Sequence, residues 1–137
     1  MNAMPEGSIK IALIEAAPED VARVRELVRT GGIPAEIADA MAAERPDLES
    51  YAIILLGLDA LDEPERDALA RLHAGFPGKP IIVLAGPGAA PRGGEAVSLG
   101  AQYVIPKSEL TAAKLSSLIR YYAGYAGGAA PPSAATA

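Results

Sequence analysis

Three short runs of branched apolar residues constrain the fold more than any other feature of this sequence. They occupy residues 9–14, 51–56 and 81–84, and each is rich in isoleucine, leucine or valine. Runs of this length without polar alternation are typical of strands buried on both faces of a sheet. Weaker strands are predicted over residues 35–39 and 102–106.

Helical patterns lie between these strands. Pro18 and the two acids after it are typical of a first helical turn, and the glycines at 31 and 32 end that helix. A short helical stretch is expected to end at Pro46, and another helix begins near Pro64. From Leu110 onward, apolar residues recur at helical spacing and predict a final helix.

The segment 86–94 interrupts this regularity. It contains four glycines and two prolines, too many for the interior of a helix. We therefore expect the front half of the fourth helix to be unravelled, with only a helical turn or two over residues 95–99. Such a segment is expected to be mobile or to order on contact with a partner. The alternative is a loose loop without a role.

Strands that alternate with helices predict a parallel sheet with helices on both faces. The expected fold is α/β and flavodoxin-like, a doubly wound five-stranded sheet with strand order 2-1-3-4-5. Its ligand sites would lie at the carboxyl ends of the strands. The predicted domain covers residues 9–123, with an N-terminal extension over 1–8 and a disordered Gly/Ala/Pro tail over 124–137.

The composition excludes several classes of function. A net charge of −5 without any Lys/Arg cluster argues against a nucleic-acid surface. The absence of cysteine and the single histidine, His73, exclude thiolate catalysis and multi-histidine metal sites. No leader peptide and no apolar run of membrane-spanning length is present, so we expect no membrane association and a cytoplasmic protein.

Four stretches, in this order and at this spacing, carry a resemblance to a known family. They cover residues 11–20, 51–58, 80–86 and 99–107. Over residues 9–123 the chain resembles the receiver (CheY-like) domain of two-component response regulators. The resemblance implies that an aspartate ending the third strand accepts a phosphoryl group from a kinase histidine. It also implies an acidic pair that holds Mg²⁺, a Ser or Thr after the fourth strand, and a Lys after the fifth.

This chain departs from that pattern at the positions that carry the chemistry. Gly57 stands at the acceptor position and offers no carboxylate nucleophile. Ala16 stands at the position of the direct metal ligand, and the adjacent Ala17 offers no oxygen ligand in its place. Ala85 stands at the hydroxyl position. We therefore expect a pseudo-receiver that is not an enzyme and holds no metal or cofactor.

Glu15 retains the first acidic position, and Lys107 is intact. Both are expected at the carboxyl edge of the sheet. They form either a partly exposed ion pair of less than about 1 kcal/mol, or a contact through which Lys107 holds the empty pocket by bonding Glu15 or Asp59. Asp59 also has two readings, a displaced phosphoryl acceptor or a solvated loop residue, because it lies two residues beyond Gly57.

Three residues near the last strand and helix are candidates for an interface. Tyr103, Arg120 and Tyr121 belong to residue types that favour protein–protein contacts. The alternative is that they are ordinary surface residues.

Two functions remain open. The first is a protein-interaction module in bacterial two-component signalling, which docks on a histidine kinase, another receiver or a similar protein without being phosphorylated. The alternative is a small-molecule or nucleotide sensor that uses the crevice left by the small residues at 16, 17, 57 and 85. The sequence leaves the partner and the oligomeric state open.

Overall fold

The computed structural model describes residues 9–15, 17–39 and 50–123 of the chain. Its centre is a five-stranded sheet with the order β2-β1-β3-β4-β5, in which every neighbouring pair is parallel. The strands are β1 (Ile9–Ile14), β2 (Ala35–Asp39), β3 (Ile53–Leu58), β4 (Ile81–Ala85) and β5 (Tyr103–Pro106). The fold class and strand order predicted from the sequence are confirmed.

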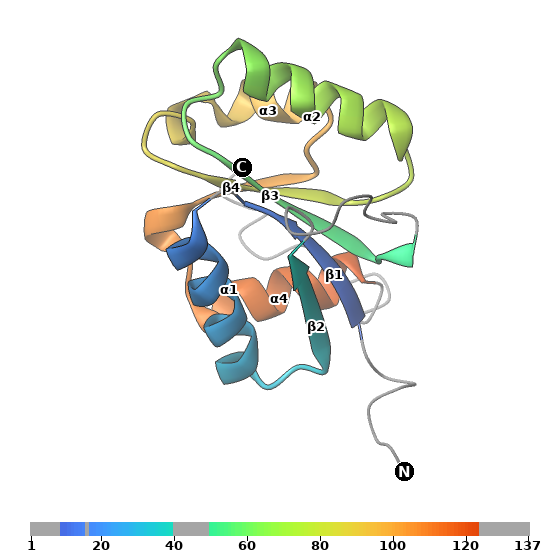
Figure 1. The fold of residues 1–137 in the computed structure, drawn as a ribbon, viewed down its shortest axis with the longest axis vertical. Coiled ribbons are helices and arrows are strands. Elements are labelled where there is room, and N and C mark those ends of the chain that lie inside the picture. The colour runs from blue at the N-terminus through green and yellow to red at the C-terminus, as the bar shows by residue number, and fades with distance from the viewer. Residues whose placement is uncertain (1–8, 16, 40–49, 124–137) are drawn as a thin grey trace.

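Helices cover both faces of the sheet (Figure 1). On one face lie α1 (Pro18–Gly31) and α4 (Ala112–Tyr122), and on the other lie α2 (Glu63–Gly75) and α3 (Gly93–Ser98). Two short 3₁₀ helices, η2 (Ala90–Arg92) and η3 (Lys107–Glu109), precede α3 and α4. None of the helices in the described ranges is long and apolar enough to cross a membrane.

Local sequence signals set the helix ends. Gly32, with φ of 74°, follows α1 and donates its N–H to the carbonyl of Arg29. The side chain of Asp62 caps α2 by accepting from the N–H of Glu65, and the hydroxyl of Thr111 caps α4 in the same way.

The apolar strand residues build one core on each face. Leu13, Leu55 and Leu84 pack against α1 and α4, whereas Ile54 and Val83 pack on the side of α2 and α3. These side chains are at most 1% exposed. Because successive strand residues point to opposite faces, two full cores require runs without polar alternation. This is the pattern that the sequence shows.

Several boundaries differ from the sequence-based prediction by one or two residues. The third strand extends to Leu58, so Gly57 lies inside β3, paired with Leu84 of β4, and not at its end. Glycine lowers strand propensity, but the apolar residues on either side keep the segment in the sheet. The last strand begins at Tyr103. The stretch before Pro46, the N-terminal extension and the C-terminal tail lie outside the described residues.

Candidate functional site

The candidate site lies at the carboxyl edge of the sheet, where ligand sites of open parallel sheets are expected. Glu15 directly follows β1, and Lys107 directly follows β5. The register pairs Leu58 with Ala85 and Ala85 with Pro106, so the ends of the central strands are level. The structure thus brings the residues at 15, 57, 85 and 107 to one edge; Ala16 lies outside the described residues.

Lys107 sits between two carboxylates. Its Nζ lies 2.8 Å from Glu15 Oε1 and donates a hydrogen bond of 2.9 Å to Asp20 Oδ2. Asp59 Oδ1 is farther away, at 4.0 Å, and the Asp59 side chain is 85% exposed. The Lys107 side chain is 17% exposed and that of Glu15 only 5%, so this is a largely buried pair and not a surface pair.

This environment favours the charged form of Lys107. Burial by itself works to lower the pKa of the ammonium group, but its contacts with Glu15 and Asp20 outweigh that effect. The pKa of Lys107 is therefore raised above its ordinary value of 10.5. Of the two interpretations of Lys107, the geometry favours the one in which it holds the pocket, with Asp20 in place of Asp59 as its second partner.

Gly57 makes room for the carboxylate of Glu15. A Cβ atom added at Gly57 would collide with Glu15 Oε1 and would lie 2.6 Å from Glu15 Cδ. Any side chain at position 57 and the observed position of Glu15 therefore exclude each other. The carboxylate of Glu15, the residue that follows β1, thus occupies the space that a side chain at position 57 would take.

The expectation of a vacated crevice is consequently wrong at this position. The small residue at 57 leaves no free volume, because the Glu15 carboxylate occupies it. The adjacent hollow lies between Asp20, Arg23 and Lys107 and measures about 10 Å³. A volume of this size holds about one water molecule, and neither Gly57 nor Ala85 lines it.

Arg23 of α1 holds the backbone of the same region. Its Nη2 donates to the carbonyl of Leu110 at 2.9 Å, and its Nη1 donates to the carbonyl of Lys107 at 3.2 Å. Both the side chain of Lys107 and the η3 backbone are thus bonded to α1. The turn from β5 to α4 therefore has a fixed position relative to α1.

A second carboxylate organises the loop after β3. The side chain of Glu65 accepts the backbone N–H groups of Asp59, Ala60 and Leu61 at 3.0, 3.0 and 2.7 Å. Burial works to raise the pKa of Glu65, but these backbone donors outweigh it and lower the pKa. Leu61 has φ of 57°, a left-handed conformation that these bonds help to stabilise.

The segment 86–94 packs against this loop. Arg92 donates to the carbonyls of Ala60 and Leu61 at 3.2 and 2.8 Å and pairs with Glu95 at 2.8 Å. A Cβ at Gly88 would lie 3.0 Å from the Asp59 carbonyl oxygen, so the turn needs glycine for its close approach.

The prediction of a shortened helix is therefore right, and Arg92 and Gly88 give the segment before it specific contacts with the loop after β3. Residues 86–92 form a turn and η2, and α3 begins at Gly93, two residues before the predicted start at 95. Glycine and proline suit this turn because its backbone approaches the backbone of the loop after β3 closely. The contact through Arg92 could not be recognised from its local sequence.

The candidate interface residues lie near β5 and the end of α4. Tyr103 is half-buried against the core, and Tyr121 contacts Tyr122 edge to face with ring centroids 4.8 Å apart. Burial and the neighbouring tyrosines raise the pKa of Tyr122. Arg120, which precedes Tyr121 on α4, is exposed. Tyr103 and Tyr121 thus both lie near Tyr122, next to the edge strand β5.

Sequence reasoning missed Asp20, Arg23, Glu65 and Arg92 as site residues. Asp20 was interpreted only as an acid in the first turn of a helix. Its distance from the end of β1 was the available signal, because a helix that follows a strand starts at the carboxyl edge of the sheet. The roles of the other three depend on contacts across the fold.

Comparisons with known proteins agree with the geometry at the level of the fold. No protein-family model and no curated protein matches the chain. Among solved structures, it is similar to a response regulator receiver domain protein from Clostridium thermocellum, with a TM-score of 0.67, 20% identity, and coverage of 85% of this chain and 94% of that one.

Two further structures extend the comparison. A putative pilus assembly-related protein from Burkholderia pseudomallei has a TM-score of 0.71 and 21% identity, covering 91% of this chain and 96% of that one. An atypical orphan response regulator with a phosphorylation-independent regulatory mechanism has a TM-score of 0.60 and 14% identity, covering 85% and 97%. The chain therefore has the fold of a response regulator receiver domain.

Proposed function

We propose that the chain is a pseudo-receiver, a protein-interaction module of bacterial two-component-type signalling that acts by contact and without phosphorylation. The receiver fold supports the signalling context. The similar atypical orphan regulator, which works independently of phosphorylation, supports this mode of action.

One observation carries the proposal. The Glu15 carboxylate lies where the side chain of an acceptor would lie, and it meets the Lys107 ammonium at 2.8 Å. Lys107 thus already has a carboxylate partner from within the chain. A phosphoryl group would find no nucleophile at position 57, and Lys107 would have to give up its contacts with Glu15 and Asp20 to bind it.

The proposal includes no enzymatic activity and no metal. Within the described residues, no group of three or more carboxylate or histidine ligands is placed to hold a metal ion. Output by contact requires a partner protein. We propose a histidine kinase, another receiver or a related signalling protein in the cytoplasm.

The proposed contact surface comprises Tyr103, Arg120 and Tyr121. Tyrosine and arginine are the residue types most often found at the energetic centres of interfaces. The tyrosine rings supply apolar area, and the tyrosine hydroxyls and the Arg120 guanidinium supply hydrogen-bonding groups.

Phosphorylation is tested with a phosphoryl mimic. Beryllium fluoride or acetyl phosphate with Mg²⁺ is added to ¹⁵N-labelled protein, and amide spectra are recorded. We expect the signals of Gly57, Ala85 and Lys107 to stay unchanged. Saturable shifts at these residues would reject the inactive assignment.

The interaction surface is tested by matched variants. Candidate kinases and receivers encoded near this chain are measured for binding to the wild type and to Tyr121→Ala, with Arg71→Ala as the control. Arg71 lies on α2, is 81% exposed and pairs only with Asp67 among the described residues. We expect Tyr121→Ala to weaken binding at least tenfold and Arg71→Ala to leave it unchanged. Equal binding by both variants would exclude this surface.

A further inference from the structure

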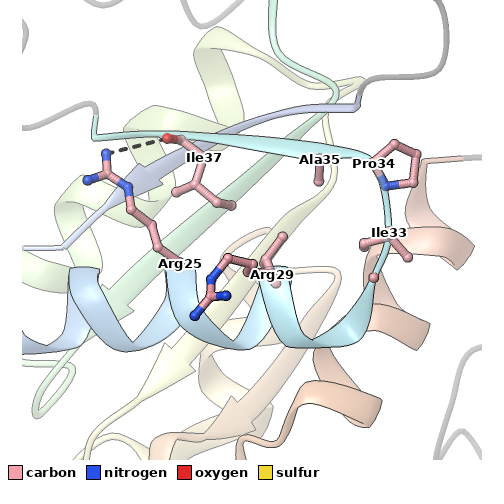
Figure 2. Close-up of a pocket in the computed structure, with 8 residues that line it drawn as sticks. Arg25, Arg29, Ile33, Pro34, Ala35 and Ile37 are labelled. Atoms are coloured by element: carbon pink, nitrogen blue, oxygen red, sulfur yellow. Dashed lines mark hydrogen bonds between the residues drawn. The ribbon is translucent and has the colours of Figure 1, made fainter. Parts of the chain in front are cut away.

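A groove opens between α1 and β2, at the opposite edge of the sheet from β5 (Figure 2). Its volume is about 550 Å³. Val28, Ile33 and Ile37 supply apolar lining, and Arg25 and Arg29 lie one helical turn apart at its rim. The groove thus combines apolar walls with two cations.

The backbone at this edge has hydrogen-bonding groups that point away from the sheet. The Pro34 carbonyl accepts the N–H of Ile9 in β1, so the backbone carbonyl of residue 34 points toward β1. Because the direction alternates along a strand, the N–H and C=O groups of Ala35 and Ile37 face outward. β2 ends the sheet, so no described strand pairs with them.

Arg25 covers part of this edge. Its Nη2 reaches the Ile37 carbonyl at 3.4 Å, a long contact near the limit for a hydrogen bond (Figure 2). Such a contact is easily exchanged for a shorter one. Arg29 pairs with Glu26 on the exposed side of the helix, where an ion pair contributes less than about 1 kcal/mol.

The charge at the groove differs from that of the whole chain. The net charge is −5, yet both long polar side chains that line the groove are guanidinium groups. Guanidinium groups bind carboxylates through paired hydrogen bonds. The groove is therefore complementary to an acidic side chain.

We infer that this groove takes an extended peptide segment of a partner protein, which adds as a further strand beside β2. The segment would pair with the outward groups of Ala35 and Ile37 and place alternate apolar side chains against Val28 and Ile33. A Glu or Asp of the segment would meet Arg25 and Arg29. Strand addition of this kind combines backbone hydrogen bonds for affinity with side-chain pockets for specificity.

The shape of the site favours a peptide over a small molecule. The groove runs beside an edge strand and is open on its outer side, so a small ligand would stay largely uncovered. A strand gains main-chain hydrogen bonds that a small carboxylate cannot make. This surface lies at the other edge of the sheet from Tyr103, so the inference stands or fails independently of the proposed function.

The test is an NMR titration with a short capped peptide of the sequence Thr-Val-Thr-Val-Thr-Glu, in which threonine occupies every second position. We expect saturable shifts confined to residues 25–39. N-methylation of the amides that face β2 removes their donors and should abolish binding, whereas methylation of the alternate amides should not. Replacing the glutamate by glutamine should weaken binding about threefold.

Protein variants provide the matching half of the test. Arg29→Gln should weaken binding of the glutamate peptide about threefold and leave that of the glutamine peptide unchanged. Arg71→Gln on α2 is the control for charge, since Arg71 is also exposed and paired with an acid. Because the peptide variants leave the protein intact, they remain informative if a protein variant unfolds.

Three outcomes would overturn the inference. These are the absence of saturable shifts, equal binding by both N-methylated peptides, and shifts that map outside the groove. Octanoate is titrated in parallel as a small carboxylate. If it binds as tightly as the peptide and shifts the same residues, the groove is a small-molecule site.

Discussion

Helix α1 serves two regions of opposite character. On the side of β5 and α4, Asp20 and Arg23 bind the side chain and backbone of Lys107, and the hollow between them holds about one water. On the side of β2, Arg25 and Arg29 line an open groove of about 550 Å³. Charged residues of one helix thus fill the space on one side and line an open groove on the other.

The difference arises from what each face of α1 meets. Asp20 and Arg23 face the turn after β5, which supplies an ammonium and two carbonyl oxygens. The groove side meets an edge strand, where Arg25 finds only one distant carbonyl. Charged groups close a site when the fold brings complementary partners within hydrogen-bond distance. Arg25 has no such close partner, and Arg29 has only the exposed Glu26, so both can turn to a ligand.

The largest expected effect comes from Lys107→Met. This change leaves the buried Glu15 carboxylate without its cation and should lower the free energy of unfolding by about 2–3 kcal/mol, measured by urea denaturation. The control is Lys114→Met, whose partner Glu109 lies at 3.8 Å on the surface, with an expected loss below about 1 kcal/mol. Equal losses of stability in the two variants would show that the Lys107 ion pair contributes no more than an exposed ion pair.

Gly57→Ala should cost about 1–2 kcal/mol, because the new methyl group displaces the Glu15 carboxylate from Lys107. If this is the cause, Glu15→Ala should remove most of the penalty. A double-mutant cycle measured by thermal or urea unfolding gives the coupling energy. Additive effects would mean that Gly57 and Glu15 do not compete for the same space.

The pH dependence follows from the raised pKa of Lys107. Its contribution to stability is complete below the unfolded-state pKa of 10.5 and is lost as the pH rises through the higher folded-state value. The stability difference between wild type and Lys107→Met should therefore stay constant from about pH 7 to 10 and shrink above that. A difference that vanishes by about pH 9 would contradict the buried ion pair.

The smallest effect is expected in the open groove. Arg25→Gln removes only the 3.4 Å contact to Ile37 and should change the free energy of unfolding by less than about 0.5 kcal/mol. A loss as large as that of Lys107→Met would show that the groove side of α1 is also held in place. The contrast between the two sides of the helix would then disappear.

The limits of prediction from this sequence are visible in particular residues. The runs at 9–14 and 81–84 predicted buried strands because their patterns are local. The residue types at 15, 57, 85 and 107 predicted a site without an acceptor, and the structure brings these residues to one edge. The free volume expected at Gly57 is absent, because residue size at one position says nothing about which neighbouring side chain occupies the space.

The amino-acid sequence by itself determined the alternation of strands and helices and the residue types at positions 57, 85 and 107, since these depend on local periodicity and on which side chains exist. Only the tertiary structure decided that Glu15 fills the space above Gly57, that Asp20 is the second partner of Lys107, and that Arg92 holds the 86–94 turn. These contacts join residues far apart in the chain. Their geometry is set by how helices pack on the sheet, which no local pattern encodes.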